Sequence, residues 1–156
     1  MKSILLGYAP IDVVHAEFEV HLRSAKESEE CHLLGTLRKV YEHLVDHFAQ
    51  EDRWMQESDF PAAGCHMDEH ARVLASAVQV VEQVQSGRFD IGFEFVDALA
   101  DWFPGHADYL DAALAVWMCK QRFGARPVVV HPRTPGAEVR QSHIGLAEPG
   151  CTGQMA

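Results

Sequence analysis

Seven side chains combine imidazoles with carboxylates at spacings that would let them hold metal ions together. They are five histidines and two acids: His15, His47, Glu51, His66, His70, His106 and Asp111. Five imidazoles and two carboxylates that can bridge are about what two metal ions of intermediate softness need when no thiolate takes part. The sequence therefore predicts a metal protein with a non-haem site for two ions.

Two pairs within this set have helical spacing. His47 and Glu51 are four residues apart, as are His66 and His70, so each pair points to one face of a helix. Both pairs continue apolar stripes, which places them in a core, where unpaired imidazoles and carboxylates would be costly. A metal removes that cost. Any one histidine alone is better explained as an ordinary core or surface group, but chance rarely produces the whole set.

The pair on the last predicted helix has a less regular spacing. Asp111 follows His106 by five residues, which in a regular α-helix leaves the two side chains about 140° apart. A turn of wider pitch would bring them closer. Pro104 gives a reason for distortion, because its nitrogen cannot donate a hydrogen bond. We therefore predict a kink or π-type turn between Phe103 and Asp111. Asp108 is the competing carboxylate and ranks second.

Apolar periodicity predicts the elements that must position these residues. Four helices are expected, at about residues 11–25, 30–57, 65–86 and 92–123. The connections are short, so consecutive helices should be antiparallel neighbours. The predicted fold is all-α, an up-down-up-down four-helix bundle that occupies residues 1–124.

The remaining segment, residues 125–156, differs in composition. It holds four of the seven prolines, together with several glycines, and no proposed ligand. We expect an extended C-terminal tail. It should be dispensable for metal binding, and it is the segment through which a protein partner would dock.

Composition excludes several classes of partner. The chain has 156 residues, a net charge of -10 and only 13 basic side chains, so no nucleic-acid partner is expected, because phosphate binding needs a basic surface. No apolar run approaches the ~20 residues of a membrane span, and the first residues are too weakly apolar for a secretory signal. The four cysteines form no CxxC pair, and we expect reduced thiols in a cytoplasmic protein.

Taken together, the motifs resemble the hemerythrin family in its bacterial single-domain form. The matching residues fall into four groups: Ile11, Asp12, His15 and Phe18; His47, Phe48, Glu51 and Met55; Phe60, Pro61, His66, Glu69 and His70; Trp102, Phe103, His106 and Asp111. The resemblance leaves only the tail uncovered and implies the same four-helix bundle.

The resemblance also implies two iron ions linked by an oxo or hydroxo group, one of which takes dioxygen as a ligand. The implied ligands form three sets: the bridging carboxylates Glu51 and Asp111; the histidines of a complete iron, His66, His70 and His106; and the histidines of an iron with an open position, His15 and His47. The expected walls of the oxygen pocket are apolar, although ordinary core packing would also explain them: Phe48, Trp102, Phe103 and Leu114.

The function implied is reversible binding of dioxygen, for carriage, storage or sensing, by a protein that is not an enzyme. The alternatives are a di-iron peroxidase or oxidase, at least with weak activity of that kind, and an iron-storage or regulatory module. Carboxylate-rich di-iron sites usually serve oxidation, whereas five histidines favour binding.

A few residues depart from what the family would have. Ala107 stands where an isoleucine is expected, directly after Pro104-Gly105-His106, and these changes would loosen the pocket. His21, His32 and His43 are additional histidines. His43 lies one turn before His47, and a surface or supporting role is the favoured interpretation. Cys65 is expected to be packed beside His66 rather than to bind metal.

Overall fold

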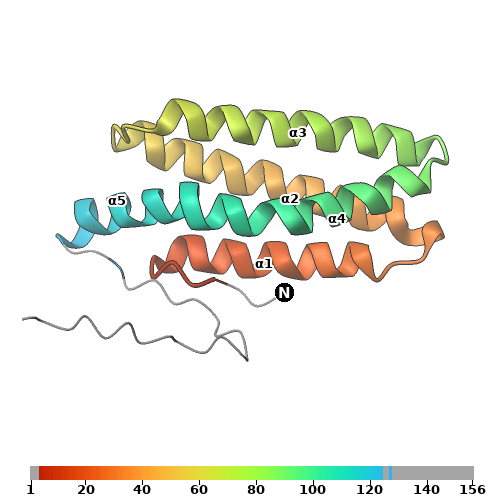
Figure 1. Cartoon of the computed structure of the whole chain (residues 1–156), viewed down its shortest axis with the longest axis horizontal. Helices are drawn as coiled ribbons and strands as arrows, with labels where there is room; N and C mark the ends of the chain where they lie inside the picture. The colour runs from red at the N-terminus through yellow and green to blue at the C-terminus, as the bar shows by residue number, and fades with distance from the viewer. Residues whose placement is uncertain (1–3, 125–126, 128–156) are drawn as a thin grey trace, which may run out of the picture.

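Four rods of helix lie side by side in the computed structural model, which describes residues 4–124 and 127 (Figure 1). The elements are α1 (Ala9–Lys26), α2 (Glu30–Glu57), α3 (Ala63–Gln85), α4 (Phe89–His106), the π-helix η1 (Ala107–Asp111) and α5 (Ala112–Phe123). The last three elements follow one another without a break and form the fourth rod. α1 and α3 each pack against both α2 and α4. The predicted all-α four-helix bundle is therefore confirmed.

The helix ends differ slightly from the predicted ones, except for α2, which has the predicted bounds. α1 begins at Ala9 because Pro10 occupies its first turn, where no backbone N–H is needed. α3 begins two residues earlier than expected and α4 three. Gly87 and Gly124, which follow α3 and α5, have φ angles of 94° and 66°, a left-handed conformation that suits glycine and ends a helix.

The predicted irregular turn is present in the fourth rod. The π-helix η1 follows α4 directly, and the backbone N–H of Ala112 donates to the carbonyl of Ala107, five residues back. This wider turn carries His106 and Asp111 to one face, so that Nε2 of His106 lies 3.1 Å from Oδ1 of Asp111. Pro104 lies inside α4, before η1 begins. The prediction of a π-type turn between Phe103 and Asp111 is confirmed.

The apolar core is divided into two clusters. The large apolar cluster consists of Phe18, Leu22, Ala25, Leu33, Leu37, Val40, Leu44, Phe48, Val84, Val96, Leu99, Phe103 and Ala107. The small apolar cluster consists of Leu6, Tyr8, Ile11, Met55, Phe60, Leu114, Ala115 and Cys119. Along α1, His15 lies between Ile11 of the small cluster and Phe18 of the large one. The seven predicted ligands thus form a polar layer between two apolar regions.

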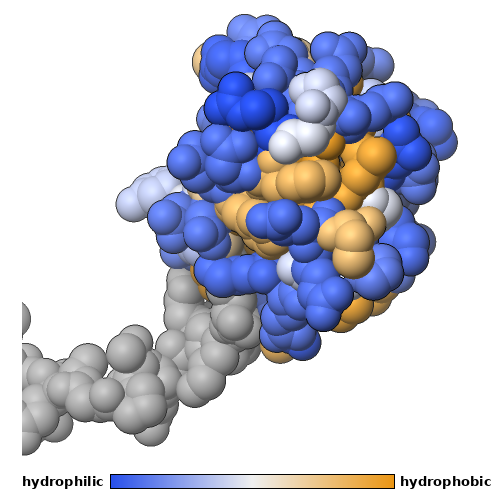
Figure 2. All heavy atoms as spheres, turned by 90° about the vertical axis from the view of Figure 1, so that its right-hand side faces the viewer, coloured by the Kyte–Doolittle hydropathy of each residue, from blue (hydrophilic) through white to orange (hydrophobic). Residues whose placement is uncertain are grey.

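Hydrophilic residues cover most of one end of the bundle (Figure 2). Seen from the end at which α3 turns into α4, hydrophilic residues surround a patch of apolar ones (Figure 2). Phe89, at the start of α4, and Val81, near the end of α3, are partly buried against the large apolar cluster. Within the described ranges, no helix is long and apolar enough to span a membrane.

Candidate metal centre

All seven residues predicted to bind metal meet in the polar layer. Each is at most 3% exposed: His15, His47, Glu51, His66, His70, His106 and Asp111. Every rod contributes, since α1 supplies one residue, α2 two, α3 two, and the fourth rod two. We call His15 and His47 the two-histidine half, and His66, His70 and His106 the three-histidine half.

Glu51 faces both halves at once. Its Oε1 lies 3.1 Å from Nε2 of His47, in the two-histidine half. Its Oε2 lies 3.7 Å from Nε2 of His66 and 3.4 Å from Nε2 of His70, in the three-histidine half. The carboxylate is therefore placed to join two ions, one on each oxygen.

Asp111 repeats this arrangement from the fourth rod. Its Oδ2 lies 3.0 Å from Nε2 of His15. Its Oδ1 lies 3.0 Å from Nε2 of His66 and 3.1 Å from Nε2 of His106. Asp108, the competing carboxylate, is exposed, so the structure brings Asp111 and not Asp108 into the polar layer.

Many polar atoms of the layer are close to one another without forming hydrogen bonds. Among the described residues, both nitrogens of His15, both oxygens of Asp111 and Oε2 of Glu51 are buried without a hydrogen-bond partner. Buried groups of this kind are normally paired, because leaving them unpaired is costly. The short distances, combined with directions that do not suit hydrogen bonds, fit side chains that share cations. Within the layer, two groups of residues have ligand atoms close enough for this: Glu51, His66, His70, His106 and Asp111; and His15, His47 and Glu51. A third group, Glu29, Cys31 and His32, is exposed and lies away from the layer.

Electrostatics within the layer also favour a cation. Burial, together with repulsion by His15, lowers the pKa of His47 to about 3, so its imidazole is neutral and keeps a lone pair. Burial and the neighbouring Asp111 raise the pKa of Glu51. Burial alone would raise the pKa of Asp111, but the imidazoles of His106, His15 and His66 outweigh it and hold the pKa well below its usual range. Keeping both Glu51 and Asp111 charged in this buried layer would cost free energy unless positive charge lies between them.

Two further carboxylates hold imidazoles of the three-histidine half from behind. Nδ1 of His70 donates to Oδ1 of Asp52 over 2.8 Å. Nδ1 of His106 donates to Oε1 of Glu69 over 3.2 Å, and Nε1 of Trp102 donates to the same oxygen over 2.8 Å. Such bonds fix the ring orientation and leave Nε2 free for a metal.

These supporting carboxylates were not predicted. Asp52 had no predicted role, and Glu69 was matched only as part of the family pattern. The available signal was position, since Asp52 directly follows Glu51 and Glu69 directly precedes His70. Burial alone would raise the pKa of Glu69, but the hydrogen bonds from Trp102 and His106 lower it, so Glu69 is charged when it supports His106.

Aromatic rings enclose the layer. Phe48 stacks on His70 with ring centroids 3.9 Å apart, and Trp102 lies 4.5 Å from His106. Phe103 lies edge-on to His15 at 4.9 Å and is 5% exposed. Of the four expected pocket walls, Phe103 is thus beside the two-histidine half and Trp102 beside the three-histidine half. Phe48 contacts both halves, since its ring centroid is also 5.3 Å from that of His47, and Leu114 is buried in the small apolar cluster.

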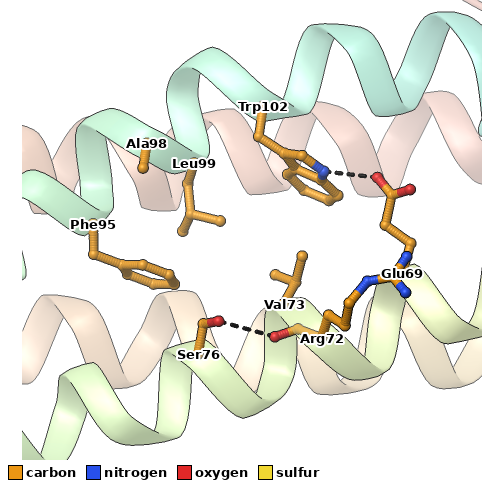
Figure 3. A pocket seen from close by; sticks show the side chains of 8 residues that line it. All are labelled: Glu69, Arg72, Val73, Ser76, Phe95, Ala98, Leu99 and Trp102. Carbon is orange, nitrogen blue, oxygen red and sulfur yellow. Dashed lines mark hydrogen bonds between the residues drawn. The ribbon is translucent and has the colours of Figure 1, made fainter.

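A cavity of about 410 Å³ opens between α3 and α4, outside the polar layer. Its lining includes Phe95, Leu99, Arg72 and the hydrogen-bonded pair Glu69 and Trp102 (Figure 3). It therefore reaches the residues that support His106 and not the proposed ligands themselves.

The three cysteines that the structure describes lie away from the centre. Cys65 is exposed, so the expectation that it packs beside His66 was wrong, although it takes no part in the polar layer. It lies in the first turn of α3, where its side chain turns away from the bundle axis. Cys31 is also exposed and Cys119 is buried in the small apolar cluster. Cys151 and the rest of the predicted tail lie outside the described residues.

Comparison with known proteins finds one informative similarity. The chain is 32% identical over 125 residues to the bacteriohemerythrin of Ralstonia nicotianae (strain ATCC BAA-1114 / GMI1000), an alignment that covers 80% of this chain and 91% of that protein. No family model matches the chain, and no solved structure matches it. The aligned length is sufficient to include the whole bundle.

Proposed function

The chain belongs to the bacterial hemerythrin family, and on this basis we propose that it holds two iron ions and binds dioxygen reversibly. Membership of the family and a buried cluster of histidines and carboxylates able to hold metal indicate an oxygen-binding protein. The choice of iron, the number of ions and the reversible chemistry are our proposal. Carriage, storage and sensing would all use the same centre.

One observation supports the two-ion assignment above the others. Glu51 and Asp111 each turn one oxygen to the two-histidine half and the other to the three-histidine half. We assign His66, His70 and His106 to one iron and His15 and His47 to the other, with both carboxylates bridging. Two ferrous ions held in this way would supply the two electrons that reversible binding of dioxygen requires.

The residues of the chain set the conditions for that chemistry. The two-histidine half has one protein ligand fewer, so it is the half with room for a small external ligand. Phe103 packs edge-on against His15 and excludes water from this side. Asp52 and Glu69 orient His70 and His106, so the three-histidine half is complete and rigid.

The proposal is tested by spectroscopy on iron-loaded protein. We expect metal analysis to give about two irons per chain after anaerobic loading, as the two halves of the layer require. Exposure to air should produce a new visible absorption band, and removal of dioxygen should reverse it without a co-substrate. One iron per chain, or a ligand set that includes a cysteine, would contradict the assignment. Rapid turnover of peroxide without a reversible oxygenated form would instead favour the peroxidase or oxidase alternative.

A further inference from the structure

Two histidines outside the proposed ligand set connect the two-histidine half to the surface. The ring centroids of His21 and His43 are 5.2 Å apart, those of His43 and His47 are 5.7 Å apart, and those of His47 and His15 are 5.3 Å apart. His21 and His43 are partly exposed, whereas His47 and His15 are buried. The four imidazoles thus form a continuous series from solvent to the polar layer.

The geometry of His43 leaves one nitrogen available for a cation. Its Nε2 lies 3.2 Å from the carbonyl oxygen of Val14. A carbonyl only accepts hydrogen bonds, so Nε2 must carry the proton, and Nδ1 keeps a lone pair. Phe18 stacks on the ring with centroids 6.0 Å apart. The ring is therefore held in place with a potential ligand atom free.

The two halves of the polar layer also differ in how firmly their rings are held. His70 and His106 are fixed from behind by Asp52 and Glu69. In contrast, both rings of the two-histidine half, His47 and His15, lack a hydrogen-bond partner at Nδ1 among the described residues, whereas in the three-histidine half this holds only for His66. The rings of His47 and His15 can therefore turn without breaking a hydrogen bond at Nδ1. The two-histidine half is thus the side at which an ion can pass most readily.

From this arrangement we propose that His21 and His43 form the route by which ferrous ions reach the two-histidine half. The proposal rests on the iron centre proposed above. An ion that crossed the apolar clusters would lose its hydration without replacement, which is prohibitively costly, whereas imidazoles suit iron as ligands. Glu17, exposed and one turn before His21 on α1, adds negative charge at the outer end. Two histidines hold an ion weakly, as a transit site must.

The test compares iron uptake by the full-length apoprotein and its variants. His43→Gln keeps a donor for the carbonyl of Val14 but removes the imidazole. His21→Gln removes the outermost imidazole of the series. His32→Gln is the control, because His32 and its possible co-ligands Glu29 and Cys31 form an exposed group that lies outside the series of four rings. It therefore tests whether loss of any exposed metal-binding histidine slows uptake. Anaerobic quenched-flow mixing with Fe²⁺, followed by a chromogenic chelator, measures the ion that remains free.

We expect His43→Gln to slow uptake about tenfold, which corresponds to about 1.4 kcal/mol in the barrier. Release of iron to a chelator should slow by the same factor, because a route is used in both directions, so the Kd should not change. His21→Gln should act in the same direction, and His32→Gln should leave both rates unaltered. A purely structural role would weaken binding instead.

Two outcomes would overturn the route. One is unchanged uptake in His43→Gln. The other is a weaker Kd caused by faster release, which would make His43 a support of the bound state. The wild-type protein distinguishes both outcomes from an error in the proposed function. If the wild-type protein takes up no iron, the proposed iron centre itself is contradicted. Circular dichroism of each variant establishes that the bundle is folded before rates are compared.

Discussion

Asp52 is an acid whose importance depends on one hydrogen bond. It accepts from Nδ1 of His70 and thereby fixes the ring whose Nε2 points to Glu51. We predict that Asp52→Asn weakens iron binding about 10–100-fold, the usual effect of losing a carboxylate behind a ligating histidine. Asp46→Asn is the control, because Asp46 is an exposed acid six residues earlier in the same half of α2, and the change should leave iron binding unaltered. Competition with a chelator of known affinity gives the measurement.

Phe103 is the residue most directly placed to keep water from the two-histidine half. We predict that Phe103→Ser admits water and speeds the irreversible oxidation of the oxygenated protein by on the order of tenfold, or about 1.4 kcal/mol in the barrier. Phe103→Leu keeps an apolar wall and should oxidise at nearly the wild-type rate. The decay of the visible band in air measures both, and equal decay in the two variants would show that Phe103 is only core packing.

For single residues, the sequence predicts the proposed metal ligands better than it predicts the carboxylates that hold those ligands in place. His47, Glu51, His66 and His70 could be recognised because helical spacing places each pair on one face and their apolar neighbours place that face in a core. Asp52 had only its position next to Glu51 as a signal. Acids at partly exposed helix positions are common, and only the packing of α2 against α3 reveals that this one meets His70.

Among the elements, α4 depends on a glycine where it crosses two neighbours. A Cβ added at Gly92 would lie 2.6 Å from Val84 and 2.8 Å from Leu33. We predict that Gly92→Ala destabilises the protein by about 1–3 kcal/mol through overpacking, even after the gain of about 1 kcal/mol in helix propensity. Gly35→Ala in α2 meets no atom within 4 Å and should be neutral or stabilising. Urea denaturation of the apoproteins compares them.

The π-helix shows what spacing can and cannot predict about an element. The five-residue separation of His106 and Asp111 predicted a wider turn, because a buried carboxylate had to face the same side as its histidine. The bounds of η1 could not be predicted. Pro104 offered an apparent cause, yet α4 continues through it to His106, so the requirement to bury Asp111 locates the turn better than the proline does.

For the molecule as a whole, the seven proposed ligands span residues 15–111, well inside the described bundle. We predict that truncation after Gly124 leaves the iron content and most of the thermal stability unchanged, since the C-terminal segment contributes no proposed ligand. Metal analysis and thermal unfolding of the truncated and full-length proteins make the comparison. Loss of iron on truncation would show that the segment closes one end of the bundle.

The polar layer that separates the two apolar clusters affects how the protein unfolds. Without metal, the layer gives little attraction between the clusters, so the regions on its two sides can open independently, as separate cooperative units. Ions held by residues from all four rods would tie these units together and merge their openings into one event. Hydrogen exchange should therefore show two levels of protection in the apoprotein, one around Leu37 and Val96 and another around Ile11 and Leu114, and a single level after loading. Equal protection in both regions of the apoprotein would show that the helices alone make the bundle one unit.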